Sequence, residues 1–257
     1  MNIFSQRKSL SDVIIAYRRP NTNHKQFLNK LLAQVRLELG STDFADKIVA
    51  AQKILWLFNE GQDVSFAIFN IIELMGSQNF NNKRIAYVLA PLIIRDTKNN
   101  EFLTLTPNIF RKDLKDMGEP LTVSISINCL SRLCNEDLAQ MLYKDLIPLY
   151  TASKALIRRK ICLLSYKFFY FLPSDAIAEL VPYVSDRLKD SKTGVQISAV
   201  TMIHEISRLN PRLFLVTIPQ LFELFNNTKS NWLIIKLIKL VSPFSEFKIV
   251  VYGILAY

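Results

Sequence analysis

Few residues in this chain have the type and spacing that a catalytic site needs. His204 precedes Glu205 in a helical pattern, which could suit general base catalysis, but no nucleophile lies near them in the sequence. The only other histidine is His24. Two carboxylate pairs occupy helical positions that capping or solvation explains: Asp113 with Asp116, and Glu136 with Asp137. We therefore predict no catalytic residue and a protein that is not an enzyme.

The cysteines and glycines give no sign of a metal or cofactor site. Cys129, Cys134 and Cys162 lack the spacing of zinc ligands, and free cysteine in an apolar helical pattern behaves as a small hydrophobic residue. The chain has only 6 glycines and no glycine-rich phosphate loop. We therefore expect no metal and no cofactor. The first residues contain no signal peptide, so we expect a reducing, cytoplasmic setting.

Composition points to a folded protein, while the net charge alone does not decide the kind of partner. Half of the 257 residues are hydrophobic, which excludes a disordered chain, and the net charge is +10. Lysines interrupt the two most apolar tracts, Trp232–Leu240 and Ile161–Leu172, before either reaches the roughly 18 uncharged residues that a membrane span needs. The charge favours nucleic acid, anionic lipid or acidic protein as a partner, although lysines spread along the chain also simply solvate helix faces.

A constant spacing of 38 residues relates three helical stretches. Ile157, Val195 and Leu233 follow one another at this interval. The same interval relates two further sets, Ile161 with Ala199 and Leu237, and Cys162 with Val200 and Ile238. Such a period is typical of helical hairpins whose apolar faces are buried only by stacking on their neighbours. We predict an all-α fold, a right-handed α-solenoid of HEAT/armadillo-like helical hairpins.

The apolar periodicity also predicts where the helices lie. Gly40 is expected to end the second of two N-terminal helices, and Ser9 or Ser11 to cap the first. The expected pairs are 44–59 with 64–75, 83–94 with 102–116, 121–134 with 135–150, 156–171 with 174–189, and 194–209 with 212–226. Pro148, Pro182 and Pro219 should lie at similar places in the second helix of a pair, where proline kinks or delays a helix.

The C-terminal region is predicted to depart from this pattern. Residues 232–241 should form the first helix of another pair, but their expected partner, 247–257, lacks a polar face. Terminal repeats of a solenoid need such a face for solubility. We therefore expect either a trunk cut short at its C-terminus or a last dozen residues that have drifted in sequence.

Clustered basic residues leave an RNA-binding alternative open. Lys154, Arg158, Arg159 and Lys160 gather at one predicted helix start, and Lys83 and Arg84 at another. RNA-reading helical repeats place recurring polar or stacking side chains at one fixed position. The aligned residues Arg158, Gln196 and Ile234 share no such code, so we expect no nucleic-acid partner.

Several segments resemble the trunk of the large adaptins of clathrin-type vesicle adaptors. The first is Phe69–Met75, followed by Lys83–Tyr87, where Ala86 replaces the glycine of a similar adaptin segment. Residues 109–114 and 231–240 look most like the delta branch, the large subunit of adaptor protein complex 3. The likeness runs from Ser9 to Leu240. The signature residues are Phe69, Asn70, Glu73, Lys83, Arg84, Tyr87, Asn231, Trp232, Lys236 and Lys239.

The resemblance implies a scaffold in a vesicle coat that sorts membrane cargo from Golgi or endosomes toward lysosome- or vacuole-like organelles. It implies sigma, beta and medium subunits as partners, together with an Arf-type small GTPase and an anionic membrane surface. Residues 1–40 would pack on the small partner chain, and residues 41–257 would form the trunk. The location would be cytoplasmic, peripherally on Golgi or endosomal membranes and transport vesicles. Another adaptin or a coatomer trunk subunit remains an alternative.

The resemblance also implies one cargo-binding residue. Residues 9–18 are similar to the first adaptin helix, which ends in an Ile-Arg pair; here Tyr17 stands in place of the isoleucine. In the related alpha chain that arginine helps to bind the acidic residue ahead of a dileucine sorting signal. Arg18 matches it, and a guanidinium suits the role because it can bind a carboxylate through two parallel hydrogen bonds. A solvated surface arginine is the alternative.

Overall fold

A computed structural model describes residues 8–20, 22–96 and 100–244. Within these ranges every regular element is an α-helix or a short 3-10 helix, so the all-α prediction is confirmed. The chain forms two compact units, residues 1–109 and 110–257, each described by itself below.

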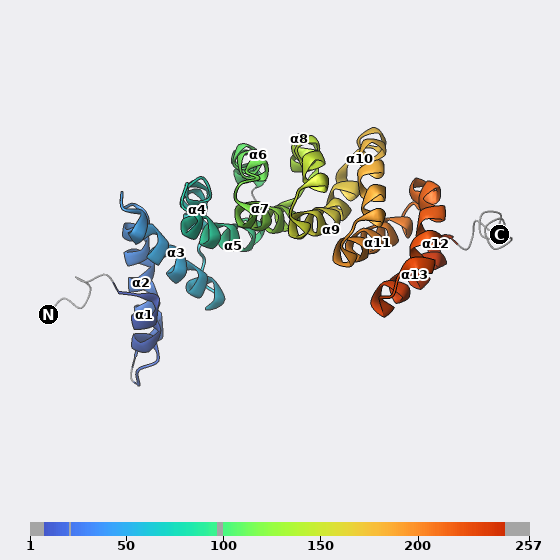
Figure 1. Ribbon diagram of the computed structural model, residues 1–257. Helices are drawn as coiled ribbons and strands as arrows, with labels where there is room; N and C mark the ends of the chain where they lie inside the picture. The colour runs from blue at the N-terminus through green and yellow to red at the C-terminus, as the bar shows by residue number, and fades with distance from the viewer. Residues whose placement is uncertain (1–7, 21, 97–99, 245–257) are drawn as a thin grey trace. The chain divides into compact units, whose positions relative to one another are not determined.

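The described part of unit 1 contains five complete α-helices, labelled α1 to α5 in Figure 1. They are α1 (Leu10–Tyr17), α2 (His24–Leu39), α3 (Phe44–Asn59), α4 (Ile68–Met75) and α5 (Phe80–Asp96), with 3-10 segments at Ser65–Ala67 and Asn100–Leu105. Helix α3 packs against α2 and α5, and α4 packs against α5. Gly40 ends α2 as predicted, and Gly61, with φ of 74°, turns the chain after α3.

A buried lysine joins α2 to α3. The Lys53 side chain is fully buried, and its Nζ donates to Glu38 Oε1 at 2.6 Å and Oε2 at 2.9 Å. Gln34 Nε2 donates to the same Oε1 at 2.7 Å. Because an unpaired buried charge is strongly destabilising, this pair fixes α3 against α2.

Unit 2 continues with helices that alternate between two layers. Helix α6 (Pro107–Lys115) contains the boundary between the units and occupies the C-terminal part of the predicted helix 102–116. The first helices of the following pairs are α7 (Pro120–Leu133), α9 (Ala155–Phe171), α11 (Thr193–Ser207) and α13 (Asn231–Phe244). The second are α8 (Glu136–Leu146), α10 (Ser174–Asp186) and α12 (Ile218–Asn227). The 3-10 segments are η3 (Ile147–Thr151), η4 (Arg187–Lys189) and η5 (Pro211–Thr217).

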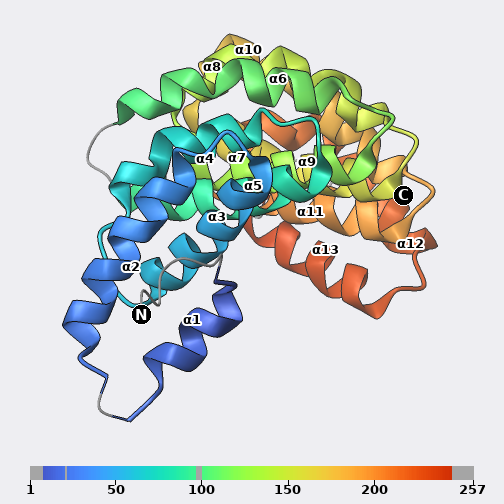
Figure 2. The same ribbon diagram turned by 90° about the vertical axis from the view of Figure 1, so that its left-hand side faces the viewer.

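The first helices of unit 2 lie side by side, which confirms the solenoid prediction. Helix α9 packs between α7 and α11, and α11 packs between α9 and α13; Figure 2 shows α8 and α10 in a separate layer from α7, α9 and α11. Ile157, Val195 and Leu233 are all buried. The 38-residue spacing therefore marks one packing position repeated in successive hairpins.

The predicted second helices are interrupted, and their prolines occupy three different places. Pro148 lies in the 3-10 segment after α8, Pro182 lies inside α10, and Pro219 lies in the first turn of α12. The predicted similar placement of the three prolines in the second helix was therefore wrong. Proline removes one N–H donor, a loss that is tolerated in the first turn of a helical segment, where Pro148 and Pro219 lie.

The structure describes the C-terminal part of the chain only as far as residue 244. Helix α13 includes the predicted residues 232–241 and extends to Phe244. The predicted partner at 247–257 lies outside the described residues.

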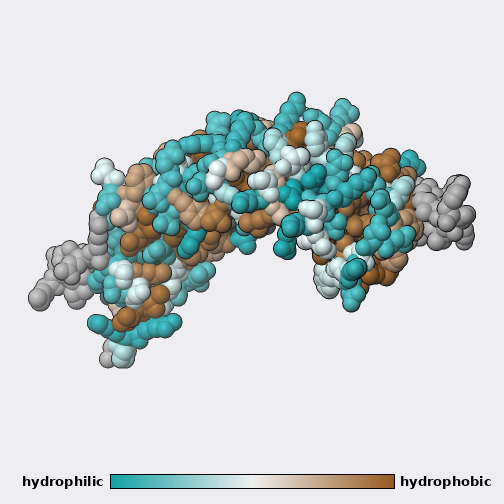
Figure 3. Space-filling view, viewed as in Figure 1, coloured by the Kyte–Doolittle hydropathy of each residue, from teal (hydrophilic) through white to brown (hydrophobic). Residues whose placement is uncertain are grey.

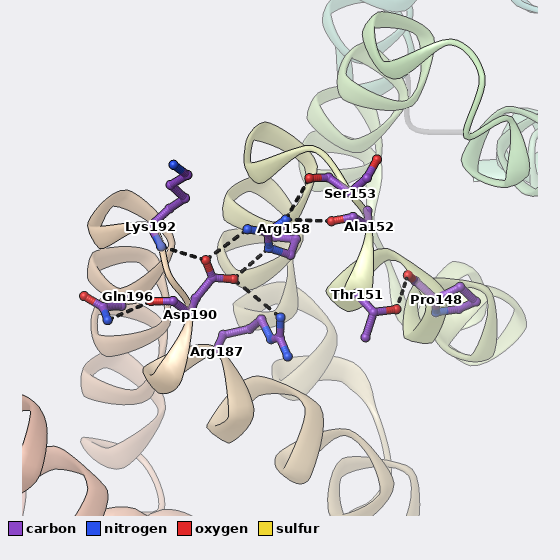
Figure 4. Close-up of polar contacts among 9 residues, drawn as sticks. All are labelled: Pro148, Thr151, Ala152, Ser153, Arg158, Arg187, Asp190, Lys192 and Gln196. Atoms are coloured by element: carbon purple, nitrogen blue, oxygen red, sulfur yellow. Dashed lines mark hydrogen bonds and ion pairs between the residues drawn. The ribbon is translucent and has the colours of Figure 1, made fainter.

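One carboxylate connects the α9–α10 hairpin to α11 (Figure 4). Arg158 of α9 donates from Nε to Asp190 Oδ2 at 2.7 Å and from Nη2 to Oδ1 at 3.0 Å. Asp190 Oδ1 also accepts from the Lys192 backbone N–H at the start of α11, and its own carbonyl accepts from Gln196 Nε2 at 2.8 Å. The hydrogen bonds from Arg158 hold the pKa of the buried Asp190 carboxyl below its ordinary value.

Burial at the repeated packing positions is testable by substitution on α9. Ile161 is buried and Leu163 is exposed on the same helix. We expect Ile161→Asp to lower the free energy of unfolding in urea by at least about 3 kcal/mol, because it places an unpaired charge between stacked helices. Leu163→Asp should change it by less than about 1 kcal/mol. Equal effects would show that the inner face of α9 is wrongly assigned.

The Arg158–Asp190 pair predicts a pH-dependent contribution to stability. Because its folded-state pKa is depressed, Asp190 contributes stability that is complete above the ordinary carboxyl pKa of about 3.9 and declines as the pH falls through the folded-state pKa. We expect Asp190→Asn to cost about 2 kcal/mol near pH 7 and progressively less below about pH 4, measured by urea unfolding. Asp186→Asn, which neutralises an exposed carboxylate four residues away, is the matched control and should have little effect.

Candidate partner-binding site

The N-terminal helix places Arg18 on the surface of unit 1. Ser9 caps α1, since its Oγ accepts from the Asp12 N–H at 3.2 Å while Asp12 Oδ2 accepts from the Ser9 N–H at 3.0 Å. Arg18 is the C-terminal capping residue, and its backbone N–H donates to the Ile14 carbonyl. The guanidinium is exposed and makes no hydrogen bond or ion pair with the described part of the chain.

Tyr17 fixes the segment that carries Arg18. Its ring lies 4.4 Å from His24, 5.8 Å from Phe27 and 5.0 Å from Trp56, measured between ring centroids. Its hydroxyl donates to Glu60 Oε2 at 3.2 Å, and burial together with this hydrogen bond raises the pKa of Tyr17. The end of α1 is therefore attached to α2 and α3, so Arg18 projects from an ordered position.

The signature residues of unit 1 divide into structural and exposed side chains. Asn70 Nδ2 donates to the Leu39 carbonyl at 3.3 Å, and both oxygens of Glu73 accept from Lys47 Nζ at 2.8 Å. Lys83 and Tyr87 are buried in α5, whereas Phe69 and Arg84 are exposed. These signature residues lie on two helices, α4 and α5, that pack against each other.

In unit 2 the remaining signature residues lie on α13. Asn231 and Trp232 are exposed at the start of the helix, Lys239 is exposed, and Lys236 is half-buried. These side chains follow the solvent-facing part of α13, while Leu233 and Leu237 of the same helix are buried.

The predicted basic cluster at the start of α9 does not form a free ridge. Arg158 donates from Nη1 to the Ala152 and Ser153 carbonyls in addition to its pair with Asp190. Lys160 Nζ donates to the Ser124 carbonyl and to Asn128 Oδ1 of α7. The exposed members are Lys154 and Arg159. Sequence reasoning missed the structural role of Arg158 because its carboxylate partner lies 32 residues later.

A shallow hollow beside this pair carries charges of both signs. It has a volume of about 500 Å³ and is open to solvent. Its charged lining residues are Arg158, Asp186, Arg187, Lys189 and Asp190. Because Asp190 already pairs with Arg158 and Arg187, the hollow offers little net charge to a ligand.

The groups that could do chemistry are poorly placed for it. His204 Nε2 lies 4.0 Å from Glu205 Oε1, and burial lowers the pKa of His204, with smaller contributions in the same direction from Arg208, Lys236 and Lys239. Burial raises the pKa of the Cys134 and Cys162 thiols to about 12 and also raises that of Cys129, so these thiols are protonated at neutral pH. Among the described residues, His, Cys, Asp and Glu form no metal-binding group of three or more, and no helix could cross a membrane.

Comparisons with known proteins agree with the sequence resemblance. The family model described as "Adaptin N terminal region" matches residues 22–246. The chain is 33% identical over 233 residues to AP-3 complex subunit delta-1 of Bos taurus, which covers 91% of this chain and 19% of the relative. It is 31% identical over 248 residues to AP-3 complex subunit delta of Saccharomyces cerevisiae, covering 95% of this chain and 26% of the relative.

Structural comparison gives the same family. A homology model of the full-length AP-3 complex in an intermediate open conformation aligns with a TM-score of 0.68 and 30% identity, over 80% of this chain and 35% of the matched chain. An engineered protein that is 11% identical aligns with a TM-score of 0.54 and shows the fold alone. This chain thus spans a minor part of the length of these AP-3 relatives. On the match over residues 22–246, the chain belongs to the adaptin family.

Proposed function

We propose that this chain is a non-enzymatic trunk segment of a coat-adaptor large subunit of the delta type. In this role it helps to sort membrane cargo from Golgi or endosomes toward lysosome- or vacuole-like organelles. The observation that carries the proposal is the adaptin match over residues 22–246, together with 31–33% identity to AP-3 delta subunits. A stack of helical hairpins suits this role because its extended faces can hold other polypeptides.

The small sigma-type chain is proposed to pack on residues 1–40. Ile15 of α1 and Leu37 of α2 are exposed aliphatic side chains in this segment, with exposed fractions of 59% and 80%. A partner that covered them would remove apolar surface from water and so stabilise the complex. Beta and medium subunits, an Arf-type small GTPase and an anionic membrane surface complete the proposed set of partners, at Golgi or endosomal membranes and transport vesicles.

Arg18 is proposed to bind the acidic residue ahead of a dileucine sorting signal. Its guanidinium is exposed, and Tyr17 fixes the backbone beside it. A fixed position limits the conformational entropy lost when a carboxylate binds. Arg19 is exposed in the next position and provides a local comparison.

RNA binding is less well supported as a function. Arg158 and Lys160 of the basic cluster are bonded within the protein, and Gln196, which aligns with Arg158, donates to the Asp190 carbonyl. Base recognition by helical repeats needs such positions to be free and recurrent.

The adaptor role predicts capture of specific partner chains. When the tagged full chain is expressed in its source cells, we expect sigma, beta and medium subunits of one adaptor complex to co-purify. Leu37→Asp should reduce sigma recovery at least about tenfold by placing a charge in the proposed apolar contact. Phe225→Asp, on exposed Phe225 of α12, is the control and should leave recovery unchanged. Absence of adaptor subunits with salt-sensitive retention of RNA would contradict the proposal.

The cargo role of Arg18 is tested with the chain bound to its sigma partner. We expect Arg18→Ala to weaken binding of a fluorescent acidic dileucine peptide about tenfold, because a charge-assisted hydrogen bond is lost. The measurement is fluorescence anisotropy, and Arg19→Ala removes the same charge one residue away. Equal affinities for wild type and Arg18→Ala would identify Arg18 as a solvated surface residue.

A further inference from the structure

Charge is divided between the two helix layers of unit 2. The first helices α7, α9 and α13 contain no aspartate or glutamate, and α11 contains only Glu205. The second helices α8, α10 and α12 carry most of the acidic residues, and their one basic residue is Lys144. The acidic residues there are Glu136, Asp137, Asp145, Asp175, Glu179, Asp186 and Glu223.

The first helices therefore form a basic face within unit 2. We define the basic face by the solvent-facing residues of α7, α9 and α13 and by Arg208 directly after α11. Its cations are Arg132, Arg159, Lys167, Arg208, Lys236 and Lys239. Successive first helices pack against each other, so these cations lie on one continuous layer. The acidic residue within the first helices of this layer is Glu205 of α11. Such a concentration of one sign attracts an acidic partner.

A line of apolar side chains crosses the basic face along α9. Leu156, Leu163 and Tyr170 are 43%, 45% and 64% exposed. They are spaced by seven residues, or about two helical turns, so they lie nearly in a straight line on one side of the helix. The opposite side of α9 supplies the buried residues Ile157, Ile161 and Phe168. Exposed hydrophobic side chains also interrupt the polar surface more widely (Figure 3).

Cations flank the apolar line on both sides. At about 100° per residue, Arg159 projects on one side of the line and Lys167 on the other. Both side chains are exposed. An apolar seam with charges along its edges is the pattern by which one helix recognises another.

We propose that the basic face binds an amphipathic helix of another protein that carries acidic residues beside its apolar stripe. Apolar side chains of the partner, repeated every seven residues, contact Leu156, Leu163 and Tyr170. Its carboxylates pair with Arg159 and Lys167. The inference is independent of the proposed cargo site, which lies in unit 1.

The seven-residue spacing favours a helix over a lipid bilayer as the partner. A bilayer surface has no repeat along its plane, so it would not select side chains at a two-turn interval. A partner helix does have this repeat, because residues seven apart return to the same side. Tyr170 also suits a protein contact, since its ring is large and its hydroxyl can remain hydrated.

The test uses the full chain and a synthetic 21-residue peptide with leucine at heptad positions a and d and glutamate at e and g. We expect binding, measured by fluorescence anisotropy, that weakens as salt increases. Leu163→Glu should reduce the affinity at least about tenfold by removing apolar contact and adding a like charge. Met141→Glu makes the same change in charge at a 53% exposed side chain of α8 and should leave the affinity unchanged.

Two further measurements keep the proposal falsifiable. Tyr170→Ala alters no charge and should still weaken binding, whereas a peptide with lysine at e and g should not bind. Equal affinities for the Leu163→Glu and Met141→Glu variants would overturn the proposal. It would equally be overturned if phosphatidylserine vesicles, and not the peptide, bound to wild type and were lost in Leu163→Glu, which would identify a membrane-binding face.

Discussion

Neighbouring first helices of unit 2 cover one another's apolar sides, and a single hairpin has no other means of burying that surface. Cys162 of α9 and Val200 of α11 are 0% exposed, and in each case the following first helix packs against theirs. Ile238 occupies the same place in α13 and is 59% exposed, because no further first helix follows within the described residues. Burial in this unit therefore depends on the stack, so a substitution that disrupts one buried position destabilises both adjoining hairpins.

The apolar register could be predicted from sequence because it is a local property repeated at a fixed interval. Helix α3 has the bounds predicted for it, Phe44–Asn59, and the register of α9, α11 and α13 was predicted from Ile157, Val195 and Leu233. The 3-10 segments η3, η4 and η5 were not predicted. Their apolar spacing continues that of the adjoining helix, and only the change in backbone hydrogen bonding separates them.

The candidate sites were harder to predict because their chemistry depends on contacts between distant residues. From the sequence alone Arg158 is a free cation, whereas in the structure it pairs with Asp190. Tyr17 is only a replacement for isoleucine in the sequence, whereas in the structure its ring packs against Trp56. The net charge of +10 likewise does not show where the cations lie on the surface, because basic residues are spread along the sequence. Once each helix is assigned to its layer, the cations of unit 2 gather on the first helices and the carboxylates on the second.

Polar contacts between neighbouring helices then determine which surface is presented. Lys160 links α9 to α7 through Asn128, and Arg158 links α9 to the start of α11 through Asp190. A slip of α9 by one turn, about 5.4 Å, would separate both pairs, whereas apolar contacts alone would tolerate such a slip more easily. The two basic side chains that are unavailable to a ligand therefore hold α9 in register between its neighbours. The same helix leaves Leu156, Leu163 and Tyr170 exposed, with Arg159 and Lys167 beside them, so α9 contributes both the internal ion pair and the external face.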